Sequence, residues 1–267
     1  MSLLVSTGIL RVFILALALG AVLLGNAANA AEEAPAGVGS REIWVGADAG
    51  AHNWLVYSGS TYAPWGDIHQ DGFRMRATTG YGHYDYQLPS LANPNKLLTV
   101  KATKTYSDAM IGYQTRFGEL TAKAFVGMAI LNNIASPVDR RARSDLSIGV
   151  KGSVELWLNL GSQAWTSLDV SYADTQETAS VRSRIGYRIL PTVSVGAEAV
   201  INHAKMFDSV QTKSVDDGRV GLFARYEWFG GEISASGGVT GDLHSVDEID
   251  LLKRPSAYGT LNLIVQF

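Results

Sequence analysis

The chain has 267 residues, of which 46% are hydrophobic and 18% charged, and its formal net charge is −3 at pH 7. This small acidic excess excludes the basic surface that a general nucleic-acid partner would require. The sequence has no cysteine, which excludes a disulfide framework and a lipid-anchored cysteine. No ligand spacing typical of a metal site occurs, and we predict no cofactor.

The first 30 residues have the features of a secretion signal. Residues 1–11 carry one positive charge, at Arg11, and the apolar run VFILALALGAVLLG follows. Ala28-Asn29-Ala30 provides a small-residue cleavage pattern, so we predict cleavage after Ala30. The alternative is a transmembrane anchor, but the run is shorter than the roughly 20 apolar residues that a membrane helix needs. Residues 31–41 are then a predicted periplasmic lead-in.

The remainder, residues 42–267, is predicted to be one domain made of segments in which apolar and polar residues alternate, as in β-strands. Most segments are near the roughly 9–11 residues that a tilted membrane strand needs. We predict about twelve strands, with ten as the alternative, over residues 42–50, 53–62, 72–86, 105–117, 119–131, 144–158, 164–173, 178–190, 192–203, 218–229, 232–241 and 257–267. No apolar run in this part is long enough for a membrane helix, so it can cross a membrane only as a closed barrel.

The connections between these segments alternate between short and long. Tight turns are expected at RFGEL, NLGSQ, LPT and GGE, and long polar loops at 87–104, 132–143, 204–217 and 242–256. Two links, AGAH and DTQE, are short on the long-loop side, and APWGDIHQD is somewhat long on the turn side. Short turns at one rim and long loops at the other are typical of outer-membrane barrels. The sequence therefore favours an antiparallel, up-and-down transmembrane β-barrel over a soluble sandwich.

Charged residues gather on one face of the strands, and in a barrel this face points into the lumen. The predicted lumen charges include Arg74, Arg76, Asp108, Lys151, Glu155, Asp169, Arg182, Arg184, Glu198, Arg225 and Glu227. One interpretation is an internal ion-pair network that fills a narrow barrel, because buried charges must be paired or hydrated. The other is a basic-leaning channel for an anionic or sugar-like solute.

The last segment is a strand with apolar residues at every second position up to Phe267. Bacterial outer-membrane barrels often end on such an aromatic residue, which their insertion machinery reads. By this resemblance Phe267 is predicted to be the C-terminal insertion signal. The predicted location is the outer membrane, with membrane lipid and the insertion machinery as partners.

Two stretches, DGFRMRATTGYGHYDY (71–86) and SDAMIGYQTRFGELTAKAFVGM (107–128), resemble the bacterial cellulose biosynthesis protein BcsS family. GVKGSVELW (149–157) and VRSRIGYR (181–188) fit the same pattern. The resemblance implies a role in cellulose export or assembly, with cellulose and cellulose synthase components as partners. The candidates to stack on glucose rings are Tyr81, Tyr84, Tyr86 and Tyr106, with a membrane-interface girdle as the alternative explanation.

Three functions remain open at this point. The first is a non-enzymatic outer-membrane accessory of cellulose secretion, acting as scaffold, pore or polymer guide. The second is an outer-membrane channel for small anionic or sugar solutes, unrelated to cellulose. The third and weakest is a lipid-modifying enzyme, because neither a GxSxG nor an HExxH motif occurs. We predict no enzymatic activity and no catalytic residue.

Overall fold

The computed structural model describes residues 39–89, 97–136, 146–207, 212–242 and 253–267. The predicted signal peptide and most of the predicted lead-in lie outside these residues. Within them, no helix is long and apolar enough to cross a membrane. The elements are β1 (Arg41–Gly50), β2 (Asn53–Tyr62), β3 (Gly72–Pro89), β4 (Leu97–Phe117), β5 (Leu120–Ser136), β6 (Leu146–Leu160), β7 (Ala164–Ala173), the 3₁₀ turn η1 (Thr175–Glu177), β8 (Thr178–Leu190), β9 (Val193–Phe207), β10 (Thr212–Trp228), β11 (Gly231–Asp242) and β12 (Lys253–Gln266).

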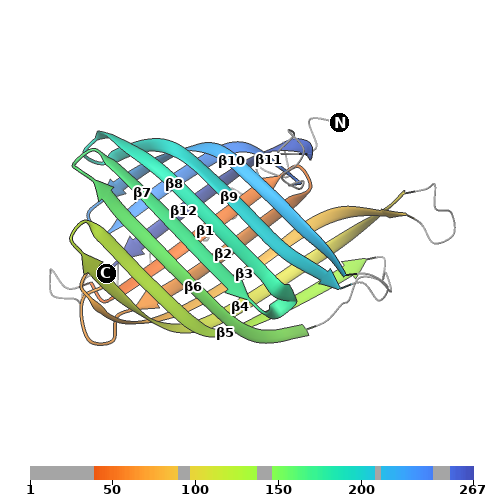
Figure 1. Ribbon diagram of the computed structural model, residues 1–267, viewed down its shortest axis with the longest axis horizontal. Coiled ribbons are helices and arrows are strands. Elements are labelled where there is room, and N and C mark those ends of the chain that lie inside the picture. The colour runs from red at the N-terminus through yellow and green to blue at the C-terminus, as the bar shows by residue number, and fades with distance from the viewer. Residues whose placement is uncertain (1–38, 90–96, 137–145, 208–211, 243–252) are drawn as a thin grey trace.

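The strands form one closed barrel in which each strand pairs with its neighbours in sequence (Figure 1). β1 closes the barrel by pairing antiparallel with β12, with Glu42 opposite Gln266 and Gly50 opposite Tyr258. Backbone hydrogen bonds of 2.9 Å in both directions join Arg41 and Phe267. The predicted antiparallel barrel is therefore confirmed, with twelve strands rather than ten.

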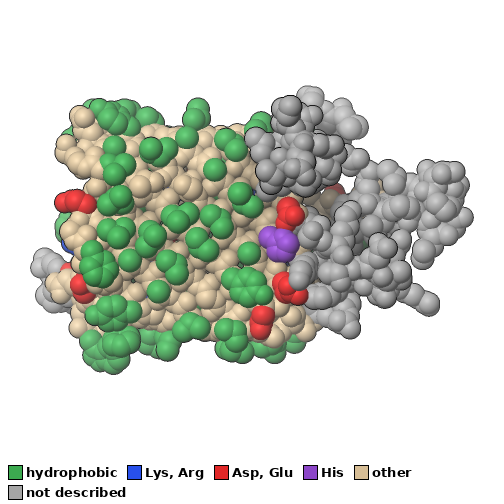
Figure 2. All heavy atoms as spheres, in the orientation of Figure 1, with side chains coloured by type: hydrophobic (Ala, Val, Ile, Leu, Met, Phe, Trp, Pro, Cys, Tyr) green, Lys and Arg blue, Asp and Glu red, His purple; other side chains and the backbone are tan. Residues whose placement is uncertain are grey.

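The outer face of the barrel is apolar, and Figure 2 shows hydrophobic side chains across it, with acidic side chains near its two ends. On β10, Val220 is 55% exposed and Leu222 is 72% exposed. Residues at alternate positions of several other strands behave in the same way, among them Met75, Ile111 and Ile185. Lipid tails require an apolar surface without unpaired backbone groups. A closed sheet with an exposed apolar band meets both requirements, because every strand edge is paired.

The two ends of the barrel differ. At the turn end, short connections follow β4, β6, β8 and β10, and three of them place Gly118, Gly161 and Gly230 at positive φ, as tight hairpin turns require. At the opposite end, the loop end, three connections are longer, residues 90–96, 137–145 and 243–252, whereas the link between β1 and β2 is only residues 51–52. Figure 1 shows β3 and β4 projecting beyond their neighbours at the loop end.

The predicted strand bounds were too short at the loop end. β4 begins at Leu97 instead of 105, β10 begins at Thr212 instead of 218, and β12 begins at Lys253 instead of 257. The segments predicted as loops 87–104 and 204–217 are therefore largely strand. These extensions mix lysines and threonines with apolar residues, so they lack the alternation that marks the membrane-facing part of a strand.

The connection between β2 and β3, residues 63–71, folds back against the lumen at the turn end. Arg74, only 2% exposed, donates hydrogen bonds to the carbonyl oxygens of Asp67 and Ile68, both at 3.2 Å, and to that of Gln70. Gln114 on β4 donates to the carbonyls of Ile68 and Gln70 at 3.2 and 3.1 Å. This segment, which we call the basal turn, is thus held by two buried lumen side chains.

Candidate functional site: the lumen

The lumen-facing positions follow from the strand register. Starting at β6, Glu155 lies opposite Asp169, which lies opposite Arg182. All eleven charged residues predicted for the lumen lie on this face, whereas their neighbours along each strand carry the exposed apolar side chains: Arg74, Arg76, Asp108, Lys151, Glu155, Asp169, Arg182, Arg184, Glu198, Arg225 and Glu227.

Several ion pairs join strands that are not neighbours in the sheet, so they cross part of the lumen. Arg76 on β3 forms a bidentate pair with Glu155 on β6. Lys151 Nζ lies 2.5 Å from Asp108 Oδ2, and Arg219 on β10 lies 3.4 Å from Asp48 on β1. Such pairs stabilise the barrel only while both partners are present, because a lone buried charge is costly.

Glu198 on β9 is the centre of a second group of contacts. Its carboxylate is 1% exposed and accepts hydrogen bonds from Arg182 at 2.8 Å and Arg184 at 3.0 Å. The hydroxyl of Tyr258 on β12 donates to its other oxygen at 3.0 Å. Glu198 therefore joins β8, β9 and β12 inside the lumen.

Aromatic rings and arginines fill the lumen in its turn-end half. We call this set the aromatic layer; its members are Arg76, Phe125, Trp157, Trp165, Phe223 and Arg225. Trp157 and Trp165 stack with centroids 4.2 Å apart, and Trp165 meets Phe223 at 5.4 Å. The guanidinium of Arg76 lies 3.9 Å from the centroid of Phe125, and that of Arg225 lies 4.7 Å from that of Trp157.

Burial confirms that the aromatic layer occupies the lumen. Trp165 is 0% exposed, and Phe125 and Phe223 are each 4% exposed. The layer receives side chains from β3, β5, β6, β7 and β10, so it reaches across the barrel from several sides. Together with the basal turn, it occupies much of the turn end of the lumen within the part of the chain that the structure describes.

Several aromatic side chains in the lumen each lie over a glycine that is directly opposite on a neighbouring strand. Trp165 is paired with Gly186, and a Cβ on that glycine would collide with the indole. Phe223 is paired with Gly196 in the same way. The same arrangement recurs at Trp44 with Gly59, Tyr57 with Gly46, Tyr106 with Gly80 and Phe125 with Gly112. The missing side chain gives the ring room to lie against the barrel wall.

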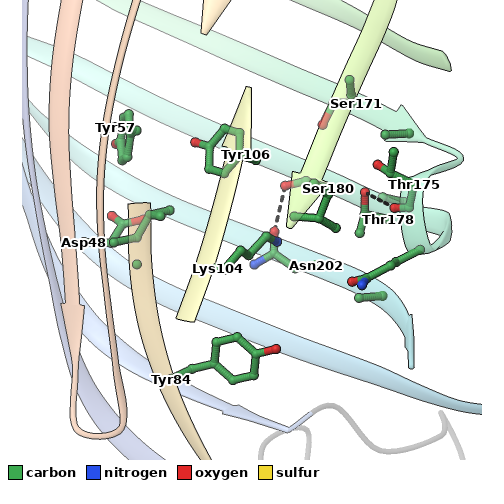
Figure 3. A pocket seen from close by; sticks show the side chains of 18 of the residues that line it. Asp48, Tyr57, Tyr84, Lys104, Tyr106, Ser171, Thr175, Thr178, Ser180 and Asn202 are labelled. Atoms are coloured by element: carbon green, nitrogen blue, oxygen red, sulfur yellow. Dashed lines mark hydrogen bonds between the residues drawn. The ribbon is translucent and has the colours of Figure 1, made fainter. Parts of the chain in front are cut away.

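Beyond the aromatic layer, the lumen is hollow. A cavity of about 820 Å³ lies in the loop-end half (Figure 3). Its lining includes the tyrosines Tyr57, Tyr84, Tyr106 and Tyr258, together with small polar residues such as Ser171, Ser180 and Asn202. Ser180 donates to Asn202 Oδ1 at 2.7 Å. The turn η1 contributes Thr175, which is 3% exposed, to the same wall.

The charges on the cavity wall nearly balance. Among the described lining residues, four are basic, Lys104, Lys151, Arg182 and Arg219, and five are acidic, Asp48, Asp108, Asp174, Glu198 and Asp217. Most of these face an opposite charge within the lumen. The lining therefore has no strong preference for an anion, unlike the basic-leaning lumen considered from the sequence.

The four tyrosines proposed from the sequence are not in one place. Tyr84 and Tyr106 line the cavity. Tyr81 is 49% exposed, is paired with Val56 and Thr105, and packs against Trp54 at 5.6 Å, on the outer face. The side chain of Tyr86 lies outside the described residues. Sequence reasoning missed Tyr57 and Tyr258, although the glycine opposite Tyr57 was a usable signal.

Two histidine–carboxylate pairs lie near the loop end. His83 Nε2 is 2.9 Å from Asp85 Oδ1, and His203 Nδ1 is 2.5 Å from Asp216 Oδ1. Among the described residues, no three His, Cys, Asp or Glu side chains are grouped in a way that could hold a metal ion.

The family of the chain follows from comparison with known proteins. A model of the cellulose biosynthesis protein BcsS family matches residues 43–267, which is nearly the whole barrel. The chain belongs to the BcsS family. The predicted family is thus confirmed, and with it a barrel related to cellulose biosynthesis. No curated protein matches this BcsS-family chain.

Several solved barrels resemble this BcsS-family structure at low sequence identity. The KdgM porin has a TM-score of 0.43 and 9% identity, covering 85% of this chain and 99% of the porin. The β domain of the Bordetella autotransporter BrkA has a TM-score of 0.47 and 12% identity, covering 86% and 100%. The translocator domain of NalP from Neisseria meningitidis has a TM-score of 0.42 and 12% identity, covering 94% and 97%.

Proposed function

We propose that this chain is a non-enzymatic accessory of cellulose biosynthesis and secretion that resides in the outer membrane and acts as a scaffold for the polymer at the cell surface. The family match supports the link to cellulose, and the apolar exterior of a closed barrel supports the membrane location. In outer-membrane barrels the short turns face the periplasm, so the turn end is periplasmic and the cavity opens outward.

The filled turn end is the observation that favours a scaffold over a pore. A polymer or solute crossing the membrane would have to pass the aromatic layer, where Trp165 is 0% exposed and Phe125 and Phe223 are 4% exposed. It would also have to pass the basal turn held by Arg74 and Gln114. The small-solute channel is the alternative, and the same filled layer argues against it.

The histidines also support a non-enzymatic role. A hydrolase of the serine or cysteine type needs a hydroxyl or thiol that is hydrogen-bonded to a base. In the described part of the chain, His83 is hydrogen-bonded to Asp85, and His203 to Asp216. Both partners are carboxylates, not the hydroxyl or thiol that such a hydrolase requires.

The function is tested by measuring secreted cellulose in a strain that lacks the gene and in the same strain complemented with the full chain. We expect cellulose to fall in the deletion strain and to return on complementation. N-terminal sequencing of the membrane protein should begin at Ala31 if the predicted signal is cleaved. Unchanged cellulose, with the protein present in the outer-membrane fraction of the parent strain, would overturn the assignment.

A further inference from the structure

The loop-end cavity has the features of a binding site rather than of unfilled space. Its volume of about 820 Å³ is within the range of about 300–1,000 Å³ that is usual for ligand sites. Its wall combines aromatic rings with hydroxyl, amide and charged groups. Sites for small ligands typically have this mixture of apolar area and a few polar groups.

The rings of Tyr57 and Tyr106 are held as flat platforms. Tyr106 on β4 lies against Gly80, which is directly opposite it on β3, and Tyr57 on β2 lies against Gly46 on β1. One side of each ring rests on the glycine backbone, and both tyrosines line the cavity. The hydroxyl of Tyr57 is fixed 2.5 Å from Asn262 Oδ1. Figure 3 shows these two rings and Tyr84 projecting into the cavity from neighbouring strands.

The polar groups of the wall include both donors and acceptors. Among them are the ammonium group of Lys104, the hydroxyls of Ser171 and Ser180, and the amide of Asn202. An anion can only accept hydrogen bonds, whereas a hydroxyl group both donates and accepts. This wall therefore suits a ligand that carries many hydroxyl groups.

We infer that the loop-end cavity binds a segment of a neutral, β-linked glucan, with its sugar rings stacked on Tyr57 and Tyr106. The nearly balanced charge of the lining favours a neutral ligand, and the flat tyrosines provide apolar faces for the C–H side of a sugar ring. The inference rests on the proposed function, because that function makes a glucan the polymer present at this surface. The buried Tyr258 forms part of the wall.

The test is calorimetric titration of the folded barrel in detergent micelles with cellohexaose as the neutral probe and an oligogalacturonate of equal length as the anionic probe. We expect cellohexaose to bind and the oligogalacturonate to bind much more weakly. Tyr106→Ala and Tyr57→Ala should each weaken cellohexaose binding about fivefold or more, as is usual for a buried aromatic contact. Tyr106→Phe keeps the aromatic ring and should retain cellohexaose binding.

Tyr81→Ala is the matched control. Tyr81 directly follows Gly80 on β3, but its side chain lies on the outer face of the barrel and not in the cavity. It should leave binding unchanged, and circular dichroism should show every variant folded. Absence of cellohexaose binding by the folded wild-type barrel would overturn the inference, as would an equal loss in Tyr81→Ala or equal affinity for the anionic probe. If binding is absent but the deletion strain still loses cellulose, only the glucan site is wrong and the proposed function stands.

Discussion

At the scale of single residues, the pair Arg76 and Glu155 joins β3 to β6 across part of the lumen. The arginine side chain is 9% exposed and the carboxylate 27% exposed, and Arg76 also lies over the rings of Trp44 and Phe125. Removing one partner leaves the other charge without its main partner in a low-dielectric lumen. Other charges nearby compensate only partly, since Lys123 lies 3.9 Å from Glu155.

We predict that Arg76→Met lowers the free energy of unfolding by about 3 kcal/mol, the lower end of what breaking a buried pair costs. Urea unfolding in micelles measures it. The double variant Arg76→Met, Glu155→Gln should recover part of the loss, and Arg116→Met, at an exposed position, should change little. Equal effects of Arg76→Met and Arg116→Met would contradict the role given to the pair.

The glycines opposite lumen aromatics allow a second prediction. Gly186→Ala should destabilise the barrel by about 1–3 kcal/mol, because the new methyl group collides with the fully buried Trp165. Gly152→Ala is the control, since its Cβ would meet only the Phe125 carbonyl oxygen, at 3.8 Å. Thermal unfolding of both variants gives the comparison, and a similar melting temperature for the two would argue against the steric explanation.

The sequence predicts which residues face the lumen but not which of them meet. Alternation along each strand assigns the eleven charges to one face, because side chains of a strand alternate between its two faces. The contact of Arg76 with Glu155 spans 79 positions and depends on barrel width and strand stagger. Neither quantity can be determined from local pattern, so the ion-pair partners and the cavity were not predictable.

At the scale of elements, strands were predictable where one face meets lipid. β2, β7 and β8 match the predicted ranges 53–62, 164–173 and 178–190 residue for residue. The extensions of β4 and β10 were missed because lysines, serine and aspartates interrupt the alternation of apolar and polar residues there. The basal turn was recognised only as longer than expected, since its fold depends on Arg74 and Gln114.

The basal turn provides a prediction at this scale. In the wild type, the Arg74 guanidinium binds three carbonyl oxygens of the basal turn, and the Ile68 amide lies 2.7 Å from the Gly39 carbonyl oxygen. Arg74→Ala removes the guanidinium, so the Ile68 amide hydrogen should exchange with deuterium about tenfold faster or more. Hydrogen exchange followed by mass spectrometry measures this. Arg188→Ala, which affects a different turn, should leave the exchange unchanged. An unaltered rate in Arg74→Ala would show that the turn is held by other contacts.

At the scale of the whole molecule, the side chains at the turn end of the lumen lead to a prediction about ion conductance. The wild-type barrel in a planar lipid bilayer should show no steady ion conductance, because the aromatic layer and the basal turn obstruct the turn end. Replacing Trp165 and Phe223 together by alanine should produce open steps. The control replaces Phe73 and Tyr113, which lie on the outer face and are 57% and 46% exposed. Steady conductance of the wild-type barrel would contradict the scaffold and favour the channel.

The pairing of Arg41 with Phe267 has a consequence for how the chain can be connected. Every seam of the barrel joins strands that follow one another in sequence, apart from the seam between β1 and β12. Since those two strand ends lie side by side at the turn end, a short linker could join them as one more hairpin. A circular permutant that is linked there and reopened at Gly161 would keep every strand neighbour. The native order of strands is thus one of several orders that give the same closed barrel.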